Sequence, residues 1–280
     1  MGYRSALTAV VAAGMLAATP VAAQPAGGLA IPNFWRQDAQ AEPVGQLPFA
    51  GIRFVTTADY PPFNFLDAAG RLTGFNIDLA RAICDELGLP CTIQARPWDD
   101  LLVALGDDRA DAAIAGVAMT AETAAEARFS DVYLKLPARF VVRRGLRLNI
   151  SPDDLANRRI AVVAGSAHEA YLQTYFPRVR IQPHATALEA ESALRLGRAD
   201  ALFGDGLQLA FWLEGIDAAD CCIFAGGPYL DSRFFGEGMA IAVAPDDDEL
   251  RHAINAALAA IAADGTYAEH YLRYFPLSFY

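Results

Sequence analysis

The side chains best suited to metal binding or catalysis are spread thinly along this chain of 280 residues. A metal site needs several histidine, cysteine or carboxylate ligands at short, regular spacing. The four histidines lie far apart, at His168, His184, His252 and His270. The chain has no phosphate-binding glycine loop, no Gly-x-Ser-x-Gly turn and no cysteine–histidine signature. The sequence therefore predicts no catalytic residue, no metal site and no cofactor.

The four cysteines are the remaining reactive side chains, and their chemistry depends on the compartment. Cys84 and Cys91 flank a predicted helix end and strand start, where a disulfide would add about 2–3 kcal/mol of stability. We predict this disulfide from the spacing and the compartment. Cys221 and Cys222 are adjacent, and a bridge between neighbours requires a strained peptide. Two buried thiols are predicted there.

The first residues predict export to an oxidising compartment. Arg4 precedes an apolar run over residues 6–19, too short to span a membrane, and small residues follow at 21–23. This order is typical of a cleaved secretory signal peptide over residues 1–23, with an uncleaved N-terminal anchor as the alternative. Residues 24–47 contain several prolines and glycines and are predicted to form a linker arm. We therefore expect a protein of the bacterial periplasm.

The mature chain is predicted to be strongly acidic. The formal charge is −11, and removal of residues 1–23, in which Arg4 is the only charged residue, leaves −12. Such a charge repels nucleic acid and anionic membranes. We expect no nucleic-acid partner. The partners that remain are a small solute and a membrane protein.

Strands and helices alternate along the rest of the chain, which predicts an α/β fold with mainly parallel sheets. The predicted strands are short apolar runs at residues 52–56, 92–95, 111–117, 159–164, 181–183, 201–204 and 239–243. The predicted helices have apolar residues at helical spacing and lie at residues 75–87, 99–105, 167–175, 187–196 and 248–263. Two similar units and a terminal segment predict two lobes, with the terminal segment completing the first.

Short motifs follow one another in a characteristic order. In the first half they are Tyr60-Pro-Pro-Phe63, Gly74-Phe-Asn-Ile-Asp-Leu-Ala80, Trp98-Asp-Asp-Leu-Leu102, Asp111-Ala-Ala-Ile-Ala-Gly116 and Phe129-Ser-Asp-Val-Tyr133. In the second half they are Val163-Ala-Gly-Ser166, Gly197-Arg-Ala-Asp-Ala201 and Asp264-Gly-Thr-Tyr267. Over residues 52–275 the chain resembles the family 3 periplasmic solute-binding proteins of ABC importers. It looks closest to the branch that binds lysine, arginine, ornithine and histidine.

This resemblance implies a two-lobed periplasmic-binding-protein (type II) fold that closes over its ligand like a Venus flytrap. Lobe 1 would comprise residues 48–138 and 235–280, and lobe 2 residues 141–232, with two hinge crossings formed by strands near 137–141 and 232–235. The implied protein is a receptor that captures a small polar solute, an amino acid or a related amine, and delivers it to an ABC importer permease. It is expected to be a monomer and not an enzyme.

The resemblance also implies a ligand site between the lobes. Tyr60, Phe63 and Trp98 occupy the family's aromatic wall, which would cover an apolar or cationic side chain; residues of the lobe core are the alternative. Asp205 matches a carboxylate that pairs with the ligand's α-ammonium group, with a solvated loop residue as the alternative. The other implied contacts are two head-group positions, Gly116 and Ala118, and a helix start that favours anions, Ser166 and Ala167.

The departure from the family pattern that matters most is at residue 123. Thr123 replaces an arginine that clamps the ligand carboxylate, and Ala118 lacks the usual hydroxyl group. Loss of one partner of such a buried pair costs about 2–5 kcal/mol. Either another cation compensates, with Arg139 and Arg233 as candidates, or the ligand has no carboxylate there. Thr123 and Asp205 together suit a neutral or cationic solute.

Two other functions are compatible with the implied fold. A periplasmic cyclohexadienyl dehydratase would need a carboxyl group, which Glu169 could supply. An accessory partner of a periplasmic enzyme, of the kind that serves methanol dehydrogenase, would have no use for the carboxylate clamp. Ligand-dependent melting separates the receptor from the accessory protein, and turnover of prephenate or arogenate identifies the dehydratase.

Overall fold

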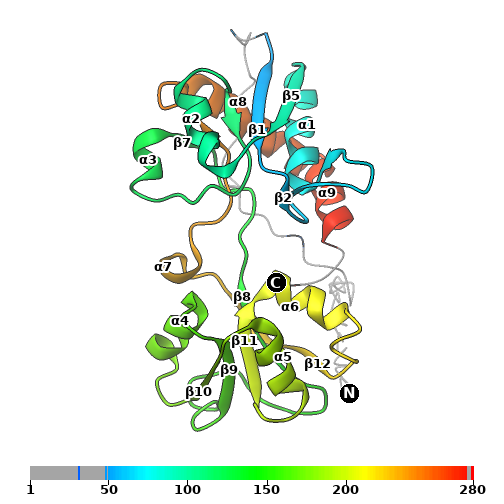
Figure 1. The fold of residues 1–280 in the computed structure, drawn as a ribbon, viewed down its shortest axis with the longest axis vertical. Helices are drawn as coiled ribbons and strands as arrows, with labels where there is room; N and C mark the ends of the chain where they lie inside the picture. The colour runs from blue at the N-terminus through cyan, green and yellow to red at the C-terminus, as the bar shows by residue number, and fades with distance from the viewer. Residues whose placement is uncertain (1–30, 32–47, 49, 276–278) are drawn as a thin grey trace, which may run out of the picture.

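The computed structural model describes residues 31, 48, 50–275 and 279–280. The predicted signal peptide and nearly all of the predicted linker arm lie outside these residues. The described chain forms two α/β lobes, one above the other in Figure 1, each built on its own five-stranded sheet. The predicted two-lobed α/β fold is confirmed.

Lobe 1 has a sheet with the strand order β5-β1-β6-β13-β7. Its strands are β1 (Ile52–Thr56), β5 (Cys91–Ala95), β6 (Ala112–Ala113), β7 (Arg128–Phe129) and β13 (Ala242–Val243). β1 runs parallel to β5 and β6, whereas β13 runs antiparallel to β6 and β7. A strand from late in the chain therefore completes the first lobe, as the sequence predicts. A separate antiparallel sheet contains β2 (Asp59–Tyr60), β3 (Asn64–Leu66) and β4 (Leu72–Thr73).

Two long helices provide much of the lobe 1 core. α1 (Phe75–Leu87) and α8 (Asp248–Ala263) pack together, and each buries one apolar stripe. Gly88 ends α1 in the left-handed conformation, which glycine adopts at little cost. The other lobe 1 helices are η1 (Trp98–Asp100), α2 (Leu101–Gly106), α3 (Thr123–Glu126) and α9 (Thr266–Tyr274).

Lobe 2 has a sheet with the strand order β10-β9-β11-β8-β12. Its strands are β8 (Ala138–Arg143), β9 (Arg159–Val163), β10 (Arg180–His184), β11 (Ala201–Asp205) and β12 (Cys222–Tyr229), and its helices are α4 (Ala167–Tyr175), α5 (Ala187–Arg195), α6 (Gly206–Glu214) and α7 (Ser232–Phe235). β9, β10 and β11 are parallel. The ends of β9 and β11 therefore lead into the starts of α4 and α6, the edge at which open α/β sheets bind ligands.

Several predicted elements are wrong in detail. The strand predicted at 111–117 pairs only over Ala112–Ala113, and the chain soon turns at Gly116, where φ is +76°. The second crossing is not a strand, because residues 232–235 form helix α7. The rings of Phe234 and Phe235 pack against the aromatic core of lobe 2. Helices α6 and α9 and strand β12 have no counterpart among the predicted elements.

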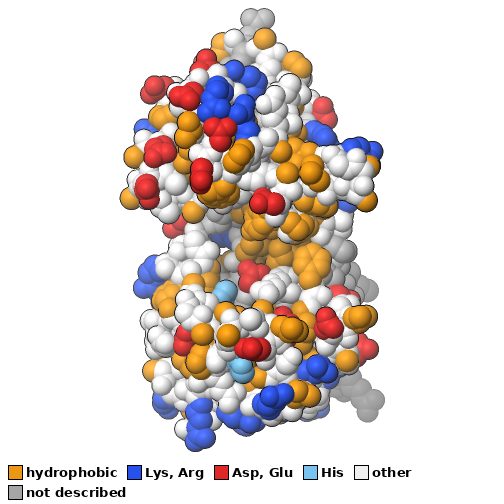
Figure 2. Space-filling view, in the orientation of Figure 1, with side chains coloured by type: hydrophobic (Ala, Val, Ile, Leu, Met, Phe, Trp, Pro, Cys, Tyr) orange, Lys and Arg blue, Asp and Glu red, His pale blue; other side chains and the backbone are white. Residues whose placement is uncertain are grey.

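The two crossings pair where they leave lobe 1. Leu134, in the first crossing, forms an isolated antiparallel bridge with Met239, in the second. Figure 2 shows the surface hollowed between the lobes, with apolar side chains above the hollow and histidine and acidic side chains below it. A ligand site is expected in this hollow.

Candidate ligand-binding site

The first two rings of the predicted aromatic wall have different surroundings. Tyr60, in β2, is 39% exposed, whereas Phe63 is 1% exposed and belongs to the lobe 1 core. The two ring centroids lie 4.8 Å apart. Phe63 therefore packs against the side of the Tyr60 ring that faces the lobe 1 core. Of the two alternatives for Phe63, the structure agrees with a residue of the lobe core, because its ring also packs against Phe275.

A chain of buried hydrogen bonds holds the turn that carries these rings. The hydroxyl of Tyr133 donates to Asn76 Oδ1 at 2.9 Å, and Asn76 Nδ2 donates to Asn64 Oδ1 at 2.8 Å. Asn64 Nδ2 in turn donates to Thr57 Oγ1 at 2.9 Å. Buried polar groups that are mutually satisfied fix one arrangement of a core. The network therefore fixes the backbone beneath Tyr60.

Trp98 remains available as a ligand contact. It is the first residue of η1 and is 53% exposed, so the indole ring is not part of the lobe 1 core. An exposed indole can cover a cation or an apolar group. Its role in the wall stays a prediction.

Gly116 lies directly beside Tyr60. A Cβ atom at Gly116 would sit 3.5 Å from Tyr60 Cε1 and 2.9 Å from Met239 Cε. A side chain here would push one of these neighbours aside, and φ of +76° adds strain for any residue but glycine. Because Gly116 has no side chain, the space beside the Tyr60 ring stays unfilled.

Thr123 is committed to its own loop. Its hydroxyl donates to the carbonyl of Ala118 at 2.6 Å and accepts the N–H of Thr120 at 3.0 Å. A hydroxyl held in this way cannot also donate to a ligand carboxylate. Thr123 and Ala118 thus lie together, but Thr123 fixes the loop and provides no free donor.

A capping box stabilises the start of α4. The Ser166 hydroxyl accepts the N–H of Glu169 at 3.2 Å, and the Glu169 carboxylate accepts the N–H of Gly165 at 2.7 Å. Within the described part of the chain, the N–H groups of Ala167 and His168 make no hydrogen bond. These two N–H groups, together with the helix dipole, can receive an anion.

Asp205 ends β11 and caps α6. Its Oδ1 accepts the N–H of Gln208 at 2.8 Å. Burial raises the pKa of the carboxyl group, because the charged form loses solvation. Among the described residues, no lysine, arginine or histidine forms an ion pair with Asp205. An anion that is partly buried and unpaired is a receptor for a cation.

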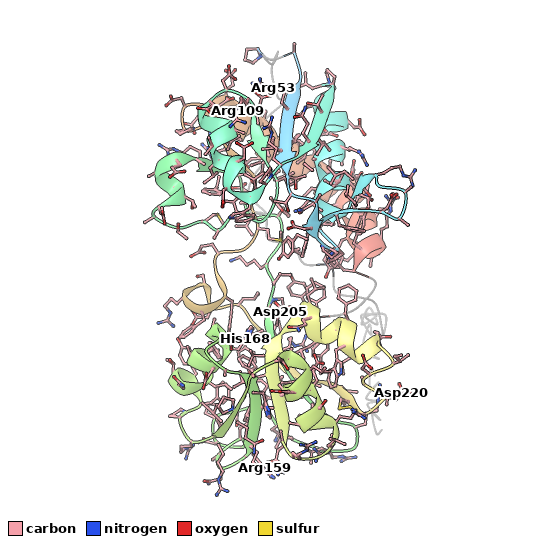
Figure 3. The ribbon with its side chains drawn as sticks, viewed as in Figure 1. Arg53, Arg109, Arg159, His168, Asp205 and Asp220 are labelled. Atoms are coloured by element: carbon pink, nitrogen blue, oxygen red, sulfur yellow. A yellow bond between two sulfur atoms is a disulfide. The ribbon has the colours of Figure 1, made fainter. Side chains whose placement is uncertain are left out.

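Groups from both lobes meet near Asp205. The pKa of Tyr60, in lobe 1, is raised by burial and also by the charge of Asp205, in lobe 2. Figure 3 shows Asp205 and His168 at the edge of lobe 2 that faces lobe 1. Tyr60 and Gly116 therefore lie together in lobe 1, and Asp205 lies at the edge of lobe 2 that faces this lobe.

His168 lies at the same edge of lobe 2 as Asp205 and is not among the residues predicted from the sequence. Its ring stacks on Phe235 at a centroid distance of 5.1 Å and meets the edge of Phe203 at 5.7 Å. Burial lowers the pKa of the imidazole to about 4, so the ring is neutral at neutral pH. Its position in the first turn of α4, directly after the implied contacts Ser166 and Ala167, could have indicated it.

Neither candidate for a compensating cation is an exposed side chain without a partner. Arg233 pairs with Asp231 at 2.8 Å. Arg139 is 5% exposed, lies over the ring of Phe224 at 4.4 Å and donates from Nη2 to the carbonyl of Gly226. The structure thus places Arg139 inside lobe 2. Arg233 is exposed but already paired, and Arg139 is buried, so neither position offers an unpaired cation at the surface.

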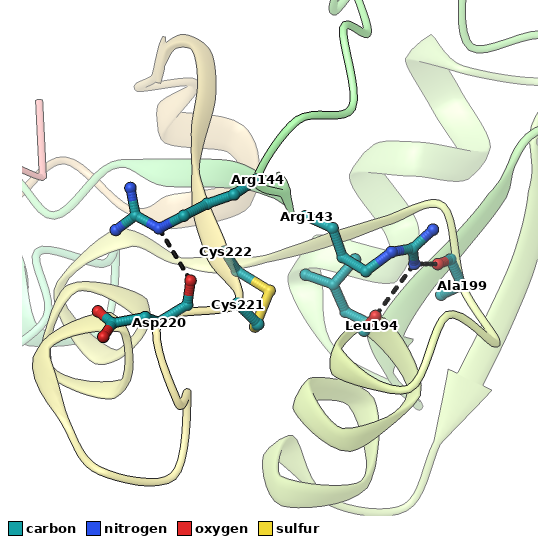
Figure 4. The surroundings of a disulfide bond; sticks show 7 residues. All are labelled: Arg143, Arg144, Leu194, Ala199, Asp220, Cys221 and Cys222. Atoms are coloured by element: carbon teal, nitrogen blue, oxygen red, sulfur yellow. Dashed lines mark hydrogen bonds between the residues drawn. A yellow bond between two sulfur atoms is a disulfide. The ribbon is translucent and has the colours of Figure 1, made fainter.

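The cysteines form two disulfides. The predicted Cys84–Cys91 bridge is confirmed, with Cα atoms 6.1 Å apart. The prediction of two thiols at Cys221 and Cys222 is wrong, because these neighbours are also bridged (Figure 4). The preceding residues Ala219 and Asp220 both have positive φ, and Arg144 Nε donates to the carbonyl of Asp220 at 2.9 Å. This unusual turn accommodates the bridge. It lies far from Asp205 (Figure 3).

No helix in the described ranges is both long and apolar enough to cross a membrane. In the same ranges, the structure gathers no group of three or more histidine, cysteine or acidic residues that could hold a metal ion.

Known proteins are similar to this chain in sequence and in fold. The profile of the bacterial extracellular solute-binding proteins, family 3, matches residues 52–277. The chain is 33% identical to ABC transporter arginine-binding protein 1 of Escherichia coli (strain K12) over 225 residues, which cover 80% of this chain and 90% of that protein.

Two solved structures are also similar. An ancestral cationic amino acid solute-binding protein is 29% identical with a TM-score of 0.60, and the match covers 81% of this chain and 96% of that one. An ancestral cyclohexadienyl dehydratase is 26% identical with a TM-score of 0.64, and the match covers 80% and 92% of the two chains. The family profile covers both lobes and every predicted site residue. The chain is a solute-binding receptor, and it belongs to the bacterial extracellular solute-binding proteins of family 3.

Proposed function

We propose that this protein is a periplasmic receptor for a small cationic solute, an amino acid or an amine, and that it acts as a monomer with an ABC importer. The observation that carries the proposal is Asp205, a partly buried carboxylate at the start of α6 with no cationic partner in the described chain. An anion withdrawn from water is costly unless it is paired. A ligand cation therefore gains the most where it meets this carboxylate.

The aromatic side chains favour the same class of ligand. The pKa of Tyr60 is raised by burial and also by the charge of Asp205, and Trp98 is exposed and outside the core. Aromatic faces attract ammonium and guanidinium groups by about 0.5–2 kcal/mol. The neutral ring of His168 adds no positive charge to repel them. Two of the similar proteins are named for arginine and for cationic amino acids, which supports this choice.

A ligand carboxylate would find weaker support. Thr123 offers no free donor, whereas the N–H groups of Ala167 and His168 are open to an anion. A helix start contributes about 1 kcal/mol to an anion, less than a bidentate arginine does. We therefore expect little difference in affinity between a cationic amino acid and the corresponding amine without a carboxylate.

The proposed receptor carries out no reaction. Glu169 is the carboxyl group that a dehydratase would use, and it is held in the capping box by the N–H of Gly165. A grip on a carboxylated substrate would also need the donor that Thr123 lacks. Both observations favour binding over catalysis, although one similar structure is an ancestral dehydratase.

A matched pair of ligands tests the proposal. Calorimetry on the mature protein compares L-arginine with agmatine, which is arginine without its carboxylate, and includes L-glutamine and L-glutamate. We expect L-arginine and agmatine to bind within about tenfold of each other, a difference of about 1.4 kcal/mol. L-glutamate should not bind. Binding of glutamate or glutamine in preference to both cations would overturn the proposal.

A further inference from the structure

Phe279 and Tyr280 lie at the junction of the two lobes. Figure 1 marks this end of the chain beside α6 of lobe 2. Phe279 is fully buried, with its ring centroid 6.1 Å from that of Tyr271 and 5.9 Å from that of Phe275, both at the end of lobe 1. The residue is therefore anchored in the lobe 1 core.

The other side of Phe279 faces lobe 2. Leu207 and Ala210, in α6, belong to the same buried apolar cluster as Phe279 and the lobe 1 core. The approach is close at the helix start, because a Cβ atom at Gly206 would lie 3.3 Å from the carbonyl oxygen of Phe279. The N–H of Gly206 donates to the carbonyl of Pro137 at 2.7 Å. The first turn of α6 is thus enclosed by residues outside its own lobe.

Tyr280 completes this contact. Its hydroxyl donates to the carbonyl of Lys135 in the first crossing. Burial raises the pKa of its phenol, and the charge of Asp205 raises it further. Through its hydrogen bond Tyr280 is joined to the first crossing, next to Phe279, whose carbonyl oxygen approaches Gly206 at the start of α6.

We propose that Phe279 and Tyr280 form an interlobe strut that seats the first turn of α6 and thereby positions Asp205. Phe279 is the anchor in lobe 1, and Leu207 and Ala210 are the surface that it supports. Asp205 caps this turn through the N–H of Gln208, so a shift of the turn moves the carboxylate with it. A binding group displaced by about 1 Å loses much of its effect. Phe279 and Tyr280 are positioning residues, since they act through Asp205.

Amide hydrogen exchange tests the strut without any ligand. In Phe279→Ala, we expect the amides of Leu207, Gln208 and Leu209 to exchange at least about 10-fold faster, because local opening of the turn becomes easier. Phe279→Leu, which keeps apolar volume, should restore most of the protection. Phe176→Ala is the matched control, because it empties a buried ring site in lobe 2 on a different apolar cluster.

A second variant approaches the contact from lobe 2. Leu207→Ala removes the apolar surface beneath the strut and should accelerate exchange at Gln208 and Leu209 in the same way, which covers the case in which Phe279→Ala does not fold. The proposal is wrong if Phe279→Ala and Leu207→Ala leave this turn as protected as in the unmodified protein. It is also wrong if Phe176→Ala exposes the turn equally.

The effect on binding rests on the proposed function and is measured separately. With L-arginine as the probe, Phe279→Ala should raise the Kd by about 10-fold, and Phe279→Leu should raise it by less than about 3-fold. If the unmodified protein does not bind L-arginine, the proposed function fails, while the exchange experiment still decides the strut. Faster exchange with unchanged affinity would overturn the positioning role.

Discussion

Tyr60 and Asp205 belong to different lobes, and the pKa of the Tyr60 phenol is raised by burial and, to a smaller extent, by the charge of Asp205. A carboxylate and an aromatic ring on opposite sides of a gap form a receptor for a cation, since both attract positive charge. The ring and the carboxylate are 145 positions apart in the sequence. Their approach is a product of the fold.

The first prediction concerns the charge of Asp205. Asp205→Asn should weaken binding of L-arginine by roughly 100-fold, because the ligand cation loses its partner. The unliganded protein should be no less stable, since asparagine also caps a helix start and needs no charge to be desolvated. Calorimetry and thermal melting measure the two effects. Asp247→Asn is the matched control, because Asp247 caps α8 in the same way at the N–H of Leu250. Equal loss of binding in both variants would contradict the prediction.

The second prediction is the pH dependence of binding. The cation needs the ionised carboxylate, so binding is present above the pKa of Asp205 and is lost as the pH falls through it. Because burial raises this pKa, the loss should set in above the ordinary aspartate value of about 3.9. Calorimetry with L-arginine between pH 7 and pH 4 measures it. His168→Gln should show the same loss, and an affinity that stays constant to pH 4 would exclude this role of the carboxylate.

The third prediction concerns His168 and stability. The folded-state pKa is about 4, below the unfolded value of about 6.5, so the unfolded chain binds more protons between these two values. The stability from the neutral ring is complete above about pH 6.5 and is lost as the pH falls towards 4, by up to about 3 kcal/mol. His168→Gln should lose less stability over this range. Chemical denaturation at several pH values provides the comparison, and identical pH profiles would refute the assignment.

The fourth prediction separates the wall from the core. Trp98→Ala should reduce affinity for L-arginine by about 10-fold and change the melting temperature little, because the ring is mainly exposed. Phe63→Ala should destabilise the protein by about 3–5 kcal/mol, because it leaves a cavity behind Tyr60. Denaturant titration and calorimetry on both variants test this contrast. A stable Phe63→Ala protein, or full affinity in Trp98→Ala, would show that the division is misplaced.

The fifth prediction concerns the cysteines. Iodoacetamide should modify none of the four in protein denatured without reductant, and all four after reduction, because both pairs are bridged. Mass spectrometry of the intact protein counts the adducts. Cys84→Ser should lower the free energy of unfolding by about 2–3 kcal/mol. Two adducts at Cys221 and Cys222 before reduction would restore the prediction made from the sequence.

Much of the fold follows from local patterns. The apolar stripe and Gly88 predicted α1, and the stripe beginning at Leu250 predicted α8, because helical periodicity and a left-handed glycine are properties of a few neighbouring residues. The order of the motifs indicated the family for the same reason, since each motif is short. Asp205 was selected because it matches a carboxylate of the family pattern.

Only the tertiary structure decided which side chains are buried by segments that are distant in the sequence. Tyr60 and Phe63 belong to one motif, yet only Phe63 is buried, because Phe275 from the end of the chain packs on it. The hydroxyl of Thr123 donates to the carbonyl of Ala118 and is therefore not available to a ligand. Phe279 packs with Leu207 and Ala210 of α6, a contact between the two lobes. A sequence records which residues are apolar or polar. Which of two neighbours loses its water is decided by the segment that arrives from elsewhere in the chain, and that arrival depends on the packing of the whole protein.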